Sequence, residues 1–245
     1  MAHAHRAHPS HAPGISRRAL VLGSIAVGIV VVVLVVTFAL GSSSSSPAPA
    51  TVNGAQRVDS LLQGIPQQGT ALGSPSAPVT LVEFADLQCP YCGVWARDAL
   101  PALVDRYVRT GKLRIVFVGM SFLGPDSVKA LRAALAAGQH SRFWNVVELL
   151  YENQGTENGG WVTDSLLRGI GAAVPGLDAE RMLAESGSPA VSRALAQADA
   201  SARQAGINAT PSFALASPGR RLHIVRPANL SAAGIEPQIE AALRR

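Results

Sequence analysis

The fold of this chain is decided by residues 78–92, which read PVTLVEFADLQCPYC. The first part of this stretch, Pro78–Phe84, is short and apolar and predicts a buried strand. A helix is expected over Tyr91–Arg109, because apolar side chains recur there at three- and four-residue spacing, and Pro101 should kink it. Residues 113–120 predict a second strand. The order strand, helix, strand is a βαβ unit with two cysteines where its helix begins.

The two cysteines of the chain, Cys89 and Cys92, are separated by Pro90 and Tyr91. Backbone N–H groups in the first turn of a helix are unpaired and the helix dipole favours an anion there. A thiolate at Cys89 is therefore stabilised, and its pKa is lowered. Pro90 suits the first helical position, where its missing N–H removes no hydrogen bond. Because Cys92 lies one turn further on, we expect Cys89 to be the attacking thiol and Cys92 the resolving one.

Three alternative roles for the cysteines account for less of this pattern. A zinc site would need two further ligands, and His140 and His223 are the only histidines outside the N-terminal tail. A structural disulfide that closes so short a loop would stabilise little. Two unrelated thiols would not account for the position at a helix start. A redox-active pair is the preferred interpretation, with no metal and no cofactor.

The rest of the domain is predicted to be helical first and then mixed. Residues 125–205 indicate an almost wholly helical region. Two short strands follow, over residues 212–215 and 222–225, and a last helix is expected over residues 236–245. Two strands, a helical insertion, two strands and a helix make the fold class α/β.

Two segments resemble the signatures of one known family. Residues 82–92, VEFADLQCPYC, resemble the active-site segment of the DsbA-like thiol–disulfide oxidoreductases of the thioredoxin superfamily. Residues 206–213, GINATPSF, resemble the second signature of that family, a loop that carries a cis proline. The resemblance covers residues 65–245. It implies a thioredoxin-like fold in which the helical insertion separates a βαβ half from a ββα half.

The resemblance also implies roles for individual residues. Pro211 would be the cis proline that faces the cysteine pair, and the backbone of Thr210 would pair with an extended substrate peptide. Glu83 would be a buried carboxylate behind the disulfide that accepts the proton of the resolving thiol, although strand alternation alone does not decide which face Glu83 takes. Pro90 and Tyr91 form the variable dipeptide at the substrate side, and Tyr91 would tune the redox potential together with Thr210.

An apolar segment precedes this domain. Residues 19–40 contain no charge and, as a helix, would extend roughly 33 Å, enough to cross a hydrocarbon core of ~30 Å. Arg17 and Arg18 come directly before it, so the positive-inside rule predicts a cytoplasmic, disordered tail over residues 1–18 and an extracytoplasmic domain. The alternatives are a twin-arginine export signal and a cleaved signal peptide, whose apolar region is usually only ~7–15 residues long. Residues 41–64 are expected to form a flexible linker.

The charge of the chain argues against a nucleic-acid binder. The net charge is +5, of which residues 1–41 contribute +3 without a single acid, and no basic cluster is present elsewhere.

Together with the resemblance, the sequence predicts a membrane-anchored, monomeric enzyme in the extracytoplasmic space. It would act as an oxidase that donates the Cys89–Cys92 disulfide to exported proteins and is recycled by a membrane redox partner. A reductase or isomerase with the same cysteines, and a non-catalytic peptide-binding module, are the alternatives.

Overall fold

The computed structural model describes residues 48–244. The predicted tail over residues 1–18, the predicted membrane helix over residues 19–40 and the first part of the predicted linker lie outside this range. Within residues 48–244, no helix is long and apolar enough to cross a bilayer.

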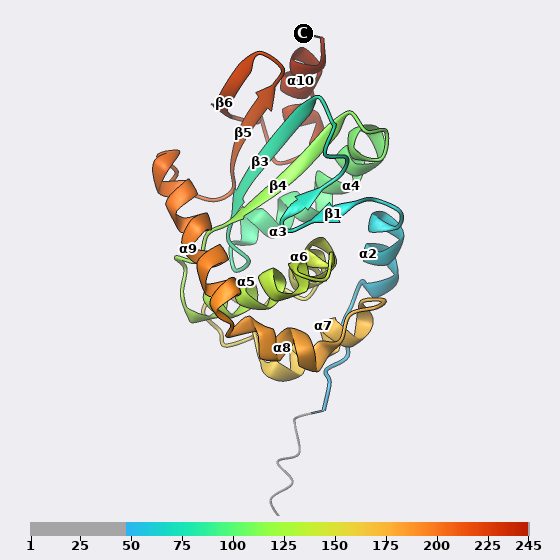
Figure 1. Cartoon of the computed structure of the whole chain (residues 1–245), viewed down its shortest axis with the longest axis vertical. Helices are drawn as coiled ribbons and strands as arrows, with labels where there is room; N and C mark the ends of the chain where they lie inside the picture. Colours follow the sequence, from blue (N-terminus) through green and yellow to red (C-terminus); the bar gives the residue numbers. More distant parts are fainter. Residues whose placement is uncertain (1–47, 245) are drawn as a thin grey trace, which may run out of the picture. The chain divides into compact units, whose positions relative to one another are not determined.

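A mixed sheet of six strands forms the centre of the described domain (Figure 1). The central strand β3 pairs in parallel with β4 and antiparallel with β5. Six of the seven residues of β3 are buried, because both faces of this strand are covered. The strands follow the order β1-β2-β4-β3-β5-β6 and are β1 (Gln67–Gln68), β2 (Ala71–Leu72), β3 (Val79–Ala85), β4 (Leu113–Gly119), β5 (Ser212–Ser217) and β6 (Arg220–Val225).

Helices surround this sheet in two groups. In Figure 1, α5 to α8 gather at one end of the sheet, and α9 leads the chain back to β5. Helices α4 and α10 pack against each other near the opposite end. The helices are α2 (Ala55–Leu62), α3 (Pro90–Asp98), α4 (Leu100–Leu103), the π-helical turn η1 (Val104–Val108), α5 (Pro125–Gly138), α6 (Phe143–Glu152), α7 (Asp164–Ala173), α8 (Ala179–Ser186), α9 (Pro189–Gln204) and α10 (Ala232–Leu243).

The βαβ unit expected from the sequence is present, with β3 and β4 at the predicted positions. Its helix is divided into α3, α4 and η1 rather than being continuous. Pro101 lies in the first turn of α4, where its missing N–H is tolerated. The proline therefore starts a new helix instead of only bending the first one. The last helix, α10, begins at Ala232, four residues before the predicted start.

The predicted flexible linker over residues 41–64 is wrong for its second part. Residues 55–62 form α2, whose Val58, Leu61 and Leu62 are buried. The helix packs against α6, and Arg57 forms an ion pair with Glu152 on that helix. The i, i+3, i+4 spacing of the three apolar residues is the signal of an amphipathic helix, and it is present in the sequence.

Candidate active site

The cysteine pair lies at the junction of β3 and α3. Cys89 is the N-cap residue of α3 in an extended conformation, and Pro90 occupies the first helical position. Both cysteines are free thiols. Cys89 is 5% exposed, whereas Cys92, one turn further on, is fully buried. Cys89 therefore keeps a small contact with solvent, whereas Cys92 has none.

The loop before β5 lies against this helix start. The peptide bond between Thr210 and Pro211 is cis, as the family resemblance implied. The Sγ atom of Cys89 lies 3.5 Å from the carbonyl oxygen of Thr210, to which the thiol donates a hydrogen bond when it is protonated. Two segments 121 residues apart in the chain are thus brought together at Cys89.

The pKa values of the two thiols are shifted in opposite directions. The pKa of Cys89 is lowered to about 6, chiefly because the thiol of Cys92 hydrogen-bonds to the Cys89 sulfur, and backbone N–H groups at the helix start add to this effect. The pKa of Cys92 is raised well above its ordinary value, first by burial and then by its interactions with Cys89. At neutral pH, Cys89 is therefore a thiolate and Cys92 a protonated thiol. This is the arrangement of a nucleophile with a shielded resolving group.

Glu83 lies on the α3 side of the central strand. Its neighbours Val82 and Phe84 belong to a small apolar cluster with Ala202 of α9, so the side chain of Glu83 takes the opposite face. Burial raises the pKa of Glu83 to about 8, and the charge of this carboxyl group in turn raises the pKa of Cys92. A carboxyl group with a pKa near neutrality beside a buried thiol can give or take its proton.

A buried polar network that sequence reasoning missed holds the segment before Cys89. Asp86 Oδ1 accepts hydrogen bonds from Ser127 Oγ at 2.6 Å and from the backbone N–H of Gln88 at 2.9 Å. The Nε2 atom of Gln154 donates to the carbonyl oxygens of Leu87 and Cys89 at 3.0 and 3.1 Å. The helical insertion thereby fixes the segment that carries the attacking thiol. The sequence did contain one sign of this network, because Asp86 is a charged residue within an otherwise apolar stretch.

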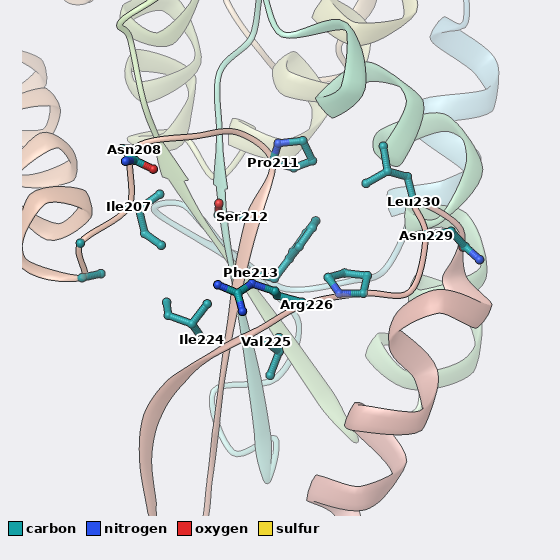
Figure 2. A pocket seen from close by; sticks show the side chains of 13 residues that line it. Ile207, Asn208, Pro211, Ser212, Phe213, Ile224, Val225, Arg226, Asn229 and Leu230 are labelled. Atoms are coloured by element: carbon teal, nitrogen blue, oxygen red, sulfur yellow. The ribbon is translucent and has the colours of Figure 1, made fainter.

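A groove of about 590 Å³ lies beside the cis proline. Figure 2 shows Pro211 and Leu230 at one end of it and Ile224 and Val225 at the other. Tyr91, in the dipeptide between the cysteines, is 64% exposed, which leaves its ring free to contact another molecule. The groove beside Pro211 and the exposed ring of Tyr91 therefore offer apolar side chains for contact with another molecule.

Comparisons with known proteins agree with this geometry. A family model described as thioredoxin matches residues 66–226. "Disulfide bond formation protein D" of Bacillus subtilis is 36% identical over 98 residues, which cover 39% of this chain and 44% of that protein. "Probable disulfide bond formation protein D" of Bacillus cereus is 35% identical over 102 residues, which cover 41% of this chain and 47% of that protein. The matched segments span less than half the length of these curated relatives.

Solved structures extend the similarity over almost the whole domain. The oxidised form of BdbD from Bacillus subtilis superimposes with a TM-score of 0.64 at 24% identity and covers 74% of this chain and 98% of its own. A thioredoxin-like oxidoreductase from Silicibacter pomeroyi superimposes with a TM-score of 0.57 at 30% identity and covers 76% of this chain and 98% of its own. Together with the relatives, these matches support thiol–disulfide oxidoreductase chemistry at the cysteine pair. The chain belongs to the thioredoxin family.

Proposed function

We propose that this chain is a thiol–disulfide oxidoreductase that works as an oxidase, donating the Cys89–Cys92 disulfide to exported proteins. The main support for this proposal is that the pKa of Cys89 is lowered, whereas the pKa of Cys92 is raised. A stable thiolate at Cys89 favours the reduced state of the enzyme, and an enzyme with a stabilised reduced state is a strong oxidant. The names of the Bacillus relatives support the same direction, since both refer to disulfide bond formation.

The reaction begins when a substrate thiolate attacks Sγ of Cys89 in the oxidised enzyme. The bond between Cys89 and Cys92 breaks, and its electron pair leaves on Cys92, which takes a proton from Glu83. A second thiolate of the substrate then attacks the substrate sulfur in the mixed disulfide and releases Cys89 as a thiolate. Its lowered pKa makes Cys89 a good leaving group. The substrate has lost two electrons and gained a disulfide, and the enzyme holds both electrons as a thiolate at Cys89 and a thiol at Cys92.

The groove beside Pro211 supports a polypeptide substrate. An extended segment beside the cis proline can pair with the backbone of Thr210, while its side chains contact the apolar residues of the groove. Tyr91, two residues after Cys89, contributes an exposed ring. Pro90, Tyr91, Thr210 and Pro211 are thus the residues that we assign to substrate contact.

The reduction potential of the cysteine pair tests the direction of the reaction. The full-length protein is equilibrated with glutathione buffers of graded composition, and the fraction of oxidised Cys89–Cys92 is measured by mass after alkylation. We expect a potential less negative than about −180 mV, the value of protein disulfide isomerase. A value near that of thioredoxin, about −270 mV, would establish the reductase alternative. A pair that exchanges with neither glutathione nor a dithiol would leave only the peptide-binding module.

The proposed location is the extracytoplasmic face of the cell membrane, with a single anchor over residues 19–40 and a membrane redox partner that reoxidises the cysteines. The uncharged segment and the preceding Arg17 and Arg18 support this orientation. Protease added to intact spheroplasts should digest the domain, and an antibody against residues 1–18 should then detect only a short fragment. If the domain survives in intact spheroplasts but is digested after lysis, the orientation is reversed.

A further inference from the structure

A buried acid besides Glu83 and Asp86 lies on a helix that packs against α3. Glu148 on α6 is 2% exposed. Its Oε1 atom is shielded from solvent and has no hydrogen-bond partner among residues 48–244. A buried polar group without a partner lowers stability, and an apolar side chain at this position would avoid that cost. The presence of an acid at this position therefore points to a role other than packing.

The surroundings of Glu148 connect it to the site. Helix α6 packs against α3, the helix that carries Cys92, and against α2. Burial, followed by the charge of Glu83, raises the pKa of Glu148 well above its ordinary value. Glu148 therefore keeps a proton while Glu83 gains and loses one, because two neighbouring carboxyl groups in a dry site do not ionise together. The charged groups that act on Glu148 are Glu83 on β3, Arg57 on α2, Arg97 on α3 and Glu152 on α6 itself. Helices α5 and α7 also pack against α6.

A second acid on the same helix lies nearer to the surface. Glu152 lies one turn beyond Glu148, on the same face of α6. The side chain of Glu152 is 15% exposed and forms an ion pair with Arg57, which is 43% exposed. Two further carboxyl groups thus act on Glu148 through their charge, Glu83 on the buried strand β3 and Glu152 at the partly exposed end of α6.

We propose that Glu148 carries protons between Glu83 and the protein surface at Glu152. The proposal rests on the oxidoreductase function, in which Cys92 leaves the disulfide and takes the proton of Glu83. The Glu83 carboxylate then takes the proton of Glu148 from one oxygen, and the other oxygen of Glu148 accepts a proton from the Glu152 side. Glu148 ends as it began, no electron moves in this step, and the net change is one proton transferred from solvent to Cys92. The reverse reaction uses the same route outwards.

The test follows the reduction of the oxidised, full-length protein by a synthetic dithiol peptide in a single turnover at pH 7. Glu148→Gln keeps the shape of the side chain but cannot carry a proton. We expect the rate to fall about tenfold, a small part of what acid–base catalysis contributes, and the solvent deuterium isotope effect to rise. The reduction potential and the titration midpoint of Cys89 should stay unchanged, because Glu148 is neutral in both redox states. An unchanged rate, or a change in potential large enough to account for the slower rate, would overturn the proposal.

A pair of shorter variants separates proton transfer from packing. Glu148→Asp and Glu148→Asn both shorten the side chain by one methylene group, and only Asp retains a titratable proton, so Asp should react about tenfold faster than Asn. Equal rates would assign Glu148 a structural role, and this comparison remains decisive if Glu148→Gln does not fold. Glu180→Gln, which removes an exposed acid on α8, should behave as the wild type. If the wild-type protein itself does not react with the dithiol peptide, the oxidoreductase function fails, whereas a reactive wild type with unaffected Glu148 variants refutes the proton route alone.

Discussion

Cys89 and Cys92 are the same type of residue three positions apart, and their surroundings give them opposite chemistry. Cys89 caps the start of α3, where the thiol of Cys92 and backbone N–H groups stabilise its negative charge. Cys92 lies within the core, where a charged sulfur is poorly solvated and the negative charge of Glu83 disfavours it further. The two thiols thus differ in pKa because Cys92 lies one helical turn further along α3, where the side chain is buried in the core.

This difference predicts selective reactivity in the reduced protein. The ultraviolet absorbance of the thiolate should titrate with a midpoint at about pH 6, the pKa of Cys89. A brief pulse of iodoacetamide at neutral pH should modify Cys89 and leave Cys92 unmodified, as measured by peptide mass. Cys89→Ser should abolish the titration at about pH 6. Equal modification of the two cysteines, or a midpoint at the ordinary thiol value, would contradict the assigned roles.

At the scale of the element, α2 shows how a segment beyond the two signatures becomes part of the domain. Val58, Leu61 and Leu62 are buried in the same core as the helices of the insertion. Asn53 extends this contact, because its backbone N–H donates to Oδ1 of Asn153 at 2.8 Å. Residues 53–62, which precede the first strand, therefore pack against the helical insertion.

Leu62→Ala tests whether α2 belongs to the cooperative fold. Leu62 is 4% exposed, so its truncation leaves a cavity and should lower the free energy of unfolding by about 2–5 kcal/mol. The neighbouring Gln63→Ala removes an exposed side chain and should change the free energy of unfolding by less than about 0.5 kcal/mol. Urea denaturation followed by circular dichroism gives both values. Equal urea midpoints for the two variants would mean that residues 55–62 behave as part of a flexible linker and not as part of the cooperative fold.

At the scale of the whole molecule, the active site couples stability to redox state and pH. In the reduced protein the pKa of Cys89 is about 6 when folded, against an ordinary value of 9.0. Between these two values the unfolded chain holds a proton that the folded protein has lost, so this group makes the folded state more stable as pH rises. Glu83 acts oppositely, since its pKa is raised from 4.5 to about 8 and the folded protein retains a proton there that the unfolded chain has lost.

Comparison with Cys89→Ser isolates the thiol contribution. The stability of the reduced wild type relative to reduced Cys89→Ser should rise as pH increases from about 6 to 9, with a slope of up to about 1.4 kcal/mol per pH unit. The contribution of Glu83 cancels, because both proteins contain that residue. Denaturant titrations at a series of pH values in the presence of a reductant provide the measurement. A difference that is independent of pH would mean that Cys89 has an ordinary pKa in the folded state.

Local patterns in the sequence were enough to predict the βαβ unit, the place of the cysteines at a helix start, the helical region before β5 and the α/β class. Each of these depends on local patterns: apolar periodicity, a proline at a first helical position and the spacing of two cysteines. The two signatures also indicated that Pro211 would lie opposite the cysteines, although 121 residues separate Cys89 from Thr210.

The surroundings of these residues depend on contacts between segments that are far apart in the chain. Strands β1 and β2 have two residues each, too few for a periodic pattern, and they exist through pairing with each other and with β4. The face that Glu83 takes became clear only from the position of Val82 and Phe84 against α9. Its interaction with Glu148 joins residues 65 positions apart, on a strand and on a helix of the insertion. Burial and electric fields depend on which elements pack together, and no spacing along the chain specifies that packing.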